Sequence, residues 1–111
     1  GNTTPLFLWF NEKGHIMFLT PINTGIRLAS GASSVGAAFP AASVVNTVQR
    51  FRVSASVAAH VRIGVGAQTA VNTDLMVVPG ESLYLSIPPG ITHIAVIQAS
   101  AAGIVQISPL D

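Results

Sequence analysis

Glycine and proline divide this chain into apolar segments that are too short to form helices. Ten Gly and seven Pro occur among the 111 residues, and they recur from Pro5 to Pro109. Many segments between them are rich in Val, Ile, Leu and Phe, residues that favour strands, and none has a clean helical period. Short strands separated by turn residues at regular spacing are typical of a β-sandwich or β-barrel. We therefore predict an all-β domain of about eight short antiparallel strands.

The best patterned segment is Val48–Val57, in which apolar and polar residues alternate. A period of two places successive side chains on opposite faces of a strand. We expect Phe51 and Val53 to face the core, and Arg50 and Arg52 to face away from it.

The following segment, His60–Val65, repeats this pattern. With Ala58-Ala59 as a hairpin turn, the two strands would pair directly and share one outward face. Arginine pairs bidentately with carboxylate and phosphate groups, so this face is a candidate contact for an acidic partner; the alternative is an ordinary solvated face. Its residues are Arg50, Arg52, His60 and Arg62, and the inward residues of the second strand are Val61, Ile63 and Val65.

Turn residues bound the strands of the C-terminal half. Pro79-Gly80 closes an apolar run at 75–78, and Pro88-Pro89-Gly90 follows an alternating run at 83–87. Both are strong turn sequences. Two further strands are expected at 92–99 and 104–108.

The segment Leu6–Phe10 is apolar on both faces of the strand that it predicts. Burial of both faces requires a central position in the domain or packing against a neighbouring subunit, and the sequence leaves both open. We expect residues 1–28 to form an N-terminal hairpin or arm and residues 29–111 to form the sandwich core, with a loose strand and a long loop at 29–47. The arm contributes three candidate partner contacts: Phe7, Trp9 and Phe10.

Charge is scarce in this chain. It has five Lys or Arg and four Asp or Glu, or 8% charged residues, against about 25% in an ordinary domain. A small domain exposes much of its surface, and charge normally keeps that surface soluble. We therefore expect other protein to cover part of it, as in a symmetric homo-oligomer. The net charge of +1 makes a nucleic-acid partner unlikely, and no stretch is dense enough in large apolar residues to predict a membrane span.

The sequence contains no motif for catalysis or for a cofactor. There is no cysteine, and His15, His60 and His93 lack the spacing of a local metal site. No nucleophile elbow is present. We expect a protein that is not an enzyme and that holds neither a metal nor a cofactor.

A series of turn and strand motifs runs through Gly31–Ser108. These are Gly31-Ala32-Ser33-Ser34, Arg50-Phe51-Arg52-Val53, Val61-Arg62-Ile63-Gly64, Asp74–Gly80 and Ile87–Ile97. In these motifs the stretch resembles a group of small virion proteins of tailed phages and prophages, encoded among head and tail structural genes. The resemblance implies an antiparallel, jelly-roll-like β-sandwich that assembles on a virion, for example as a head decoration or cement protein, and it brings no catalytic residues.

Two functional hypotheses follow. The first is a non-enzymatic virion subunit, assembled in the host cytoplasm, that forms a homo-oligomer (most plausibly a trimer) and binds phage capsid or neck proteins. The alternative is a carbohydrate-binding β-sandwich module of a phage tail or a secreted protein, in which Trp9 and Tyr84 would be the aromatic platforms.

Overall fold

The computed structural model describes residues 7–10, 16–19, 21, 24–40 and 49–110, with side chains from residue 21 onward. The described residues form ten strands. They are β1 (Phe7–Phe10), β2 (Ile16–Leu19), β3 (Ile26–Ser30), β4 (Val35–Ala38), β5 (Gln49–Ala55), β6 (Ala59–Gly64), β7 (Leu75–Val77), β8 (Leu83–Ile87), β9 (His93–Gln98) and β10 (Gly103–Leu110).

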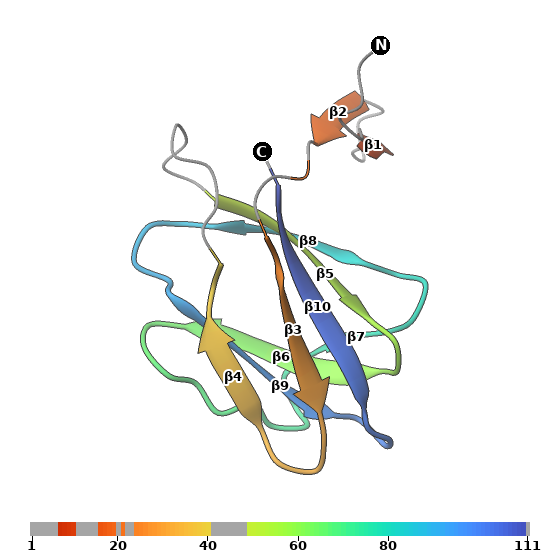
Figure 1. Cartoon of the computed structure of the whole chain (residues 1–111), viewed down its shortest axis with the longest axis vertical. Helices are drawn as coiled ribbons and strands as arrows, with labels where there is room; N and C mark the ends of the chain where they lie inside the picture. Colours follow the sequence, from red (N-terminus) through yellow and green to blue (C-terminus); the bar gives the residue numbers. More distant parts are fainter. Residues whose placement is uncertain (1–6, 11–15, 20, 22–23, 41–48, 111) are drawn as a thin grey trace.

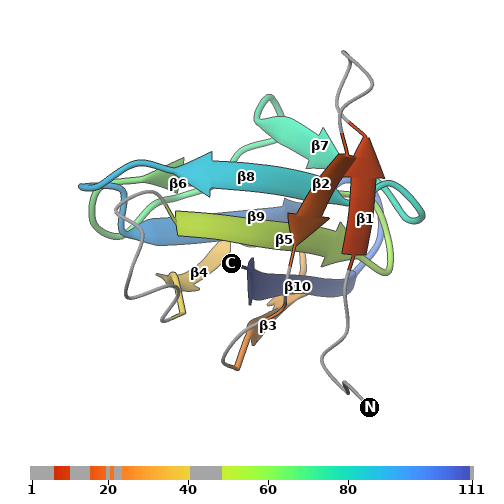
Figure 2. The same cartoon turned by 90° about the horizontal axis from the view of Figure 1, so that it is seen from above.

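Eight of these strands form two antiparallel sheets of four. The first sheet has the order β3-β10-β5-β8, and the second has the order β4-β9-β6-β7. The predicted antiparallel β-sandwich is therefore confirmed. Figure 1 shows the two layers, and Figure 2 shows β8, β5, β10 and β3 side by side across the first sheet.

The strand pairs are nested around the link between β6 and β7. β6 pairs with β7, β5 with β8, β4 with β9, and β3 with β10. Apart from the β6–β7 link, each connection within the sandwich passes from one sheet to the other. The chain is thus one long hairpin rolled into two layers, so most contacts join residues that are distant in sequence.

The core lies between the sheets, as the alternation predicts. Phe51 and Val53 face inward from β5, with exposed fractions of 2% and 0%. The Phe51 ring stacks on Phe39 with centroids 4.7 Å apart. Both sheets contribute side chains with no exposure, namely Val53, Val105 and Ile107 from the first and Ile94 and Val96 from the second.

Both turn predictions of the C-terminal half are confirmed. The Glu81 N–H donates to the Val78 carbonyl at 3.2 Å across Pro79-Gly80, and Gly80 has a φ of +84°. Proline followed by a residue of positive φ is the signature of a type II turn. Gly90, after Pro88-Pro89, has a φ of +101°.

The predicted hairpin between β5 and β6 is wrong. The two strands belong to different sheets, and Ala59, expected in the turn, is a fully buried residue that begins β6. The chain that leaves β5 is held to β10 instead: the Ser56 N–H donates to the Ile104 carbonyl at 2.9 Å, and the Ile104 N–H donates to the Ser56 hydroxyl at 2.8 Å. These bonds direct the chain across to the second sheet.

Inward burial along β6 is also shorter than predicted. Val61 is buried, but Ile63 is 37% exposed and Val65, beyond the end of the strand, is 71% exposed. β7 begins at Leu75, opposite Val61, so Ile63 and Val65 have no β7 residue beside them.

The segment 29–47, expected as a loose strand and a long loop, contains the end of one strand and one complete strand. β3 runs from Ile26 to Ser30 and straddles the expected boundary at residue 28, and β4 follows at Val35–Ala38. Residues 41–48 lie outside the described part of the chain.

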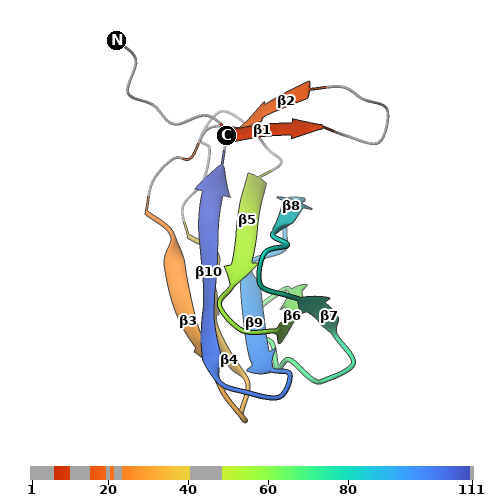
Figure 3. The ribbon, with the colours of Figure 1, turned by 90° about the vertical axis from the view of Figure 1, so that its right-hand side faces the viewer.

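The N-terminal strands β1 and β2 form an antiparallel pair, with Phe7 opposite Leu19 and Phe10 opposite Ile16. The pair lies at the end of the sandwich where β10 finishes (Figures 1 and 3). The side chains of Phe7, Trp9 and Phe10 lie outside the described part of the structure, so these contact candidates stay predictions.

Candidate functional site

The outer face of the first sheet carries three of the five Lys and Arg residues of the chain. Arg50 and Arg52 alternate along β5 with the core residues Phe51 and Val53, so they face away from the core. Arg27 on β3 is exposed on the same face. We call these three arginines the arginine face.

Strand register sets the spacing of this face. Arg52 lies opposite Ser108 on β10 and Tyr84 on β8, while Arg27 lies opposite Gln106 on β10. β10 separates β3 from β5, so Arg27 and Arg52 stand two strand spacings, about 10 Å, apart across the sheet. Among the described residues, no Asp or Glu belongs to a strand of this sheet. The face therefore combines positive charge with neutral polar side chains.

The four-residue basic patch expected from the sequence does not form. His60 and Arg62 lie on β6 in the second sheet, whereas Arg50 and Arg52 lie on β5 in the first. The outer faces of a sandwich point in opposite directions, so the two pairs cannot contact one flat partner surface together.

His60 is buried, contrary to the expected outward exposure. Its side chain is 8% exposed, and its Nδ1 lies 3.0 Å from the backbone carbonyl of Asp74. A carbonyl only accepts, so Nδ1–H is the donor and the tautomer is fixed. His60 therefore anchors the loop of residues 65–74, which we call the β6–β7 loop.

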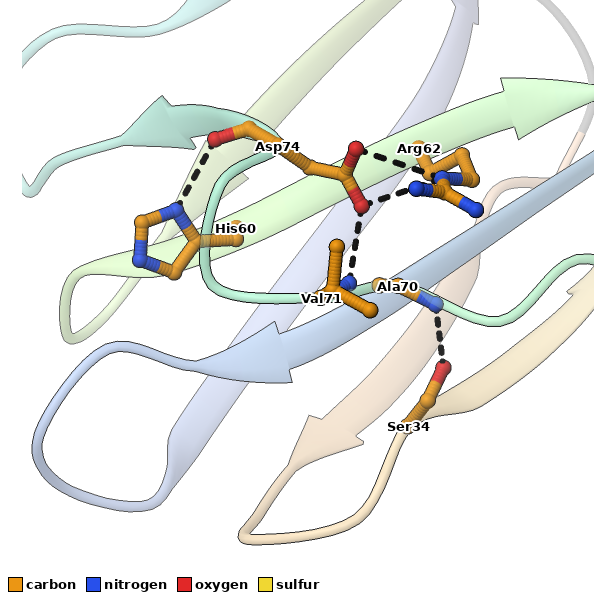
Figure 4. Close-up of polar contacts among 6 residues, drawn as sticks. All are labelled: Ser34, His60, Arg62, Ala70, Val71 and Asp74. Atoms are coloured by element: carbon orange, nitrogen blue, oxygen red, sulfur yellow. Dashed lines mark hydrogen bonds and ion pairs between the residues drawn. The ribbon is translucent and has the colours of Figure 1, made fainter.

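Arg62 and Asp74 complete this anchor (Figure 4). The Arg62 Nε lies 3.1 Å from one carboxylate oxygen of Asp74, and the Val71 N–H donates to the same oxygen at 2.8 Å. The Val71 N–H, followed by the Arg62 guanidinium and His60, holds the pKa of the Asp74 carboxyl below its ordinary value of 3.8. These groups stabilise the loop, so Arg62 is already engaged within the chain.

The β6–β7 loop extends across the outer face of the second sheet. At its far side, the Ala70 N–H donates to the Ser34 hydroxyl at 2.8 Å, just before β4 (Figure 4). Ala70 is 1% exposed, and Ala95 on β9 below it is fully buried although it faces away from the core. The loop thus covers part of the sheet with small side chains.

A pocket of about 320 Å³ lies where this loop meets β4. The strand side consists of small residues, and the polar groups come from Gln68 in the loop and His93 on β9. The Gln68 Nε2 lies 3.0 Å from the Val65 carbonyl and 3.3 Å from the Gly66 carbonyl. Its full lining is Gly36, Ala37, Ala38, Ala67, Gln68 and His93.

Hydrogen bonds orient His93 at the pocket. Its Nδ1 lies 2.7 Å from the Thr92 hydroxyl, which accepts a bond of 2.9 Å from the Gly66 N–H. A hydroxyl has one donor and two acceptor positions, so it can either donate to Nδ1 or accept a second bond from Nδ1–H, and both arrangements hold the imidazole ring in place.

Exposed large apolar side chains gather in the β6–β7 region. Leu75 and Met76 on β7 are 57% and 47% exposed. Seven described residues are exposed in this way, and five of them fall between residues 63 and 76: Ile63, Val65, Val71, Leu75 and Met76. These five residues are close in sequence, and exposed apolar residues that form one patch mark interaction surfaces.

No group of three His, Cys, Asp or Glu able to hold a metal occurs among the described residues. Within the same part of the chain, no helix is long and apolar enough to cross a membrane. No protein-family model, no curated protein and no solved structure matches the chain.

Sequence reasoning located Arg50 and Arg52 on an outer face but missed Arg27 as their neighbour. It also missed the pocket, because Gln68 and Gly36 belong to segments without a strong pattern. The one available signal was the run of Gly and Ala at 36–38, which is unusual in a strand because such residues bury little surface.

Proposed function

We propose that this chain is a non-enzymatic structural subunit of a phage virion. It acts as a head decoration or cement-like protein, assembles in the host cytoplasm as a homo-oligomer with a trimer favoured, and binds neighbouring capsid or neck proteins. The observation that carries this proposal is the arginine face. In a chain with so few charges, three arginines on one sheet face give a defined polar contact surface for an acidic partner.

Two further features support a subunit role. The nested strand pairing is compatible with the proposed jelly-roll arrangement, an architecture used by viral capsid proteins as well as lectins and cupins. The exposed apolar side chains of the β6–β7 region suit a contact that excludes water. Fold alone does not assign function, so the surfaces carry the argument.

The two surfaces suit different partners. Two copies of the arginine face would repel each other in an isologous contact, in which the same patch meets itself. That face therefore suits an acidic protein of another kind. The exposed apolar side chains of the β6–β7 region suit a second copy of this chain.

Light scattering on a size-exclusion column, over a dilution series, tests the self-assembly. We expect a closed oligomer that Leu75→Lys dissociates, because a buried lysine would lose its hydration without a partner. Ile104→Lys is the matched control, since Ile104 is also exposed but lies on β10. A monomer at every concentration, combined with no sedimentation of the protein with tailed-phage shells, would refute the proposal.

The alternative function, a carbohydrate-binding module, has one favourable observation. Tyr84 lies on the outer face of the first sheet, opposite Arg52, where an aromatic ring and a guanidinium together would suit a sugar. Glycan-array binding that Tyr84→Phe retains and Tyr84→Ala abolishes, in a folded protein, would support this function over the first.

A further inference from the structure

β4 is an edge strand that contains no charged residue or proline to prevent its free side from pairing with another strand. It lies at the end of the second sheet and pairs only with β9 among the described strands. Its sequence, Val35–Ala38, has neither a charge nor a proline. The other three edge strands differ: β3 carries Arg27, β7 has three residues, and β8 is followed directly by Pro88-Pro89. Charges, prolines and short length are the common ways to protect an edge.

The alternation of hydrogen bonds along β4 shows which of its backbone groups point to the free edge of the sheet. The Phe39 N–H donates to the Thr92 carbonyl at 2.9 Å, and Ala37 lies opposite Ile94 in the same register. In an antiparallel pair, alternate residues bond to the partner strand. Ala37 therefore bonds toward β9, and the N–H and C=O groups of Gly36 and Ala38 point to the free edge.

The pocket adjoins this same edge. It is lined by three consecutive β4 residues, so it follows the strand backbone rather than one outer side chain. Gly36 is needed here, because a Cβ at this position would lie 2.9 Å from the Ile94 carbonyl oxygen and 3.2 Å from the Ala95 Cβ. The absence of a side chain also keeps the pocket floor open beside the edge.

The pocket presents polar groups from the loop and from β9. Both contacts of the Gln68 Nε2 are to carbonyls, so the amide nitrogen is the atom on that side and Oε1 is its remaining acceptor. His93 adds a ring nitrogen, Nε2, that donates in one tautomer and accepts in the other. A carboxamide suits this pair in either tautomer, because its NH₂ donates and its C=O accepts. A carboxylate has no donor for the Gln68 oxygen.

We propose that β4 and this pocket form a binding site for an extended peptide segment of a partner protein. The segment adds to the second sheet as a fifth strand beside β4 and places an Asn or Gln side chain between Gln68 and His93. Main-chain hydrogen bonds supply the affinity in such strand addition, and a side-chain pocket supplies the specificity. The paired backbone groups at the edge favour a peptide over a sugar, which has no repeat of N–H and C=O groups. The site lies on the second sheet, away from the arginine face, and its lining includes none of the exposed apolar residues of the β6–β7 region.

NMR titration of the ¹⁵N-labelled full chain tests this site. The probes are acetylated, amidated hexapeptides Thr-Val-Xaa-Val-Thr-Val with Xaa as Asn, Gln, Ala, Asp or Lys. We expect Asn or Gln peptides to shift the amide signals of Gly36, Ala38 and Gln68, and to bind about tenfold more tightly than the Asp peptide. Shifts by all five peptides with equal affinity would overturn the pocket's role, and no shift at these residues would overturn the site.

Two variants and one control accompany the titration. Ala38→Pro removes an edge N–H that bonds to no partner strand, so the β4–β9 pairing stays intact, and Ala67→Leu fills the pocket from an exposed position. Both should abolish the shifts. Ile104→Ser changes an exposed residue of the first sheet, outside the pocket, and should not. If Ala38→Pro unfolds the chain, Ala67→Leu still decides the question.

A saccharide panel separates the two ligand classes at this site. Glucose, galactose, mannose and N-acetylglucosamine are titrated under the same conditions. We expect no shift of the pocket signals. A saccharide that shifts them, when no peptide does, would replace the peptide site with a sugar site.

Discussion

Asp74 joins three parts of the chain through one side chain and its own backbone. Its carboxylate accepts from Val71 and pairs with Arg62, while its carbonyl accepts from His60 on the same strand as Arg62. The side chain of Arg62 is 39% exposed, so the ion pair alone contributes little. Its importance is geometric: it fixes the end of the loop that forms one wall of the pocket.

The lowered pKa of Asp74 predicts a loss of stability in acid. A carboxyl whose pKa is lower in the folded state stabilises the fold above its ordinary pKa, and this contribution disappears as the pH falls through the folded value. We expect the melting temperature of the wild type to fall below about pH 4 more steeply than that of Asp74→Asn. Melting curves between about pH 7 and pH 2 measure this. Glu81→Gln, at an exposed carboxyl, should keep the wild-type slope, and equal slopes for all three proteins would contradict the role of Asp74.

Gly80 has the backbone conformation that other residues adopt at a cost. Its φ of +84° is required at the third position of the turn between β7 and β8. We predict that Gly80→Ala destabilises the fold by about 1 kcal/mol. Gly31→Ala is the matched comparison, because a Cβ there meets nothing within 4 Å and the φ is not positive. Urea unfolding should show that Gly31→Ala is neutral or slightly stabilising, and equal losses in both variants would refute the turn argument.

At the scale of elements, β10 is central to the first sheet. It pairs with β3 on one side and β5 on the other, and it contributes Val105 and Ile107 to the core. Its two isoleucines differ in environment although they are three residues apart. Ile107 has no exposure, whereas Ile104 is 36% exposed on the outer face.

This difference in burial predicts that the same substitution lowers the free energy of unfolding by different amounts at the two positions. Ile107→Ala removes a side chain from a packed interior and should cost about 2–5 kcal/mol of unfolding free energy. Ile104→Ala should cost less than about 1 kcal/mol, because the site is partly solvated already. Chemical denaturation of both variants, fitted with one common denaturant dependence of the unfolding free energy, measures the difference between their stabilities. A loss in Ile104→Ala as large as that in Ile107→Ala would show that another subunit covers the outer face.

The strand predictions fared differently according to how much each depended on local pattern. Alternation correctly placed Phe51 and Val53 inward, since the apolar face of a strand is a local property. β4 was expected only as a loose strand, because Gly36 and its alanine neighbours have weak strand propensity; pairing with β9 orders them instead. The exposure of Ile63 depends on the residue at which β7 begins, and the sequence around Ile63 does not encode that residue.

At the scale of the whole molecule, the two outer faces of the sandwich have different characters. The first sheet presents the arginine face, and the β6–β7 loop covers much of the second sheet. Arg62 is tied to Asp74 inside that cover, whereas Arg27 is exposed. A charged partner would therefore distinguish the two faces.

This asymmetry predicts unequal effects of removing one positive charge. Arg27→Gln should weaken sedimentation with tailed-phage shells and reduce its dependence on salt, since exposed charges act over about one Debye length. Arg62→Gln removes the same charge from the other sheet and should leave this binding unchanged. Binding measured at several salt concentrations decides between them. Equal weakening in both variants would mean that net charge, and not the arginine face, drives the contact.

The sequence by itself determined the all-β class, the strands from β5 to β10, the turns at Pro79-Gly80 and Pro88-Pro89-Gly90, and which side of β5 faces the core. These follow from steric preferences and from a period of two, which act over a few residues. Only the tertiary structure decided that the link of Ser56–Ala58 crosses between sheets, that His60 lies beneath a loop, and that the pocket forms beside β4. A hairpin and a crossing between sheets have the same local alternation. The pairing of β5 with β10, about fifty residues away in the chain, distinguishes the two arrangements. Bonds between such distant strands outweigh local preference.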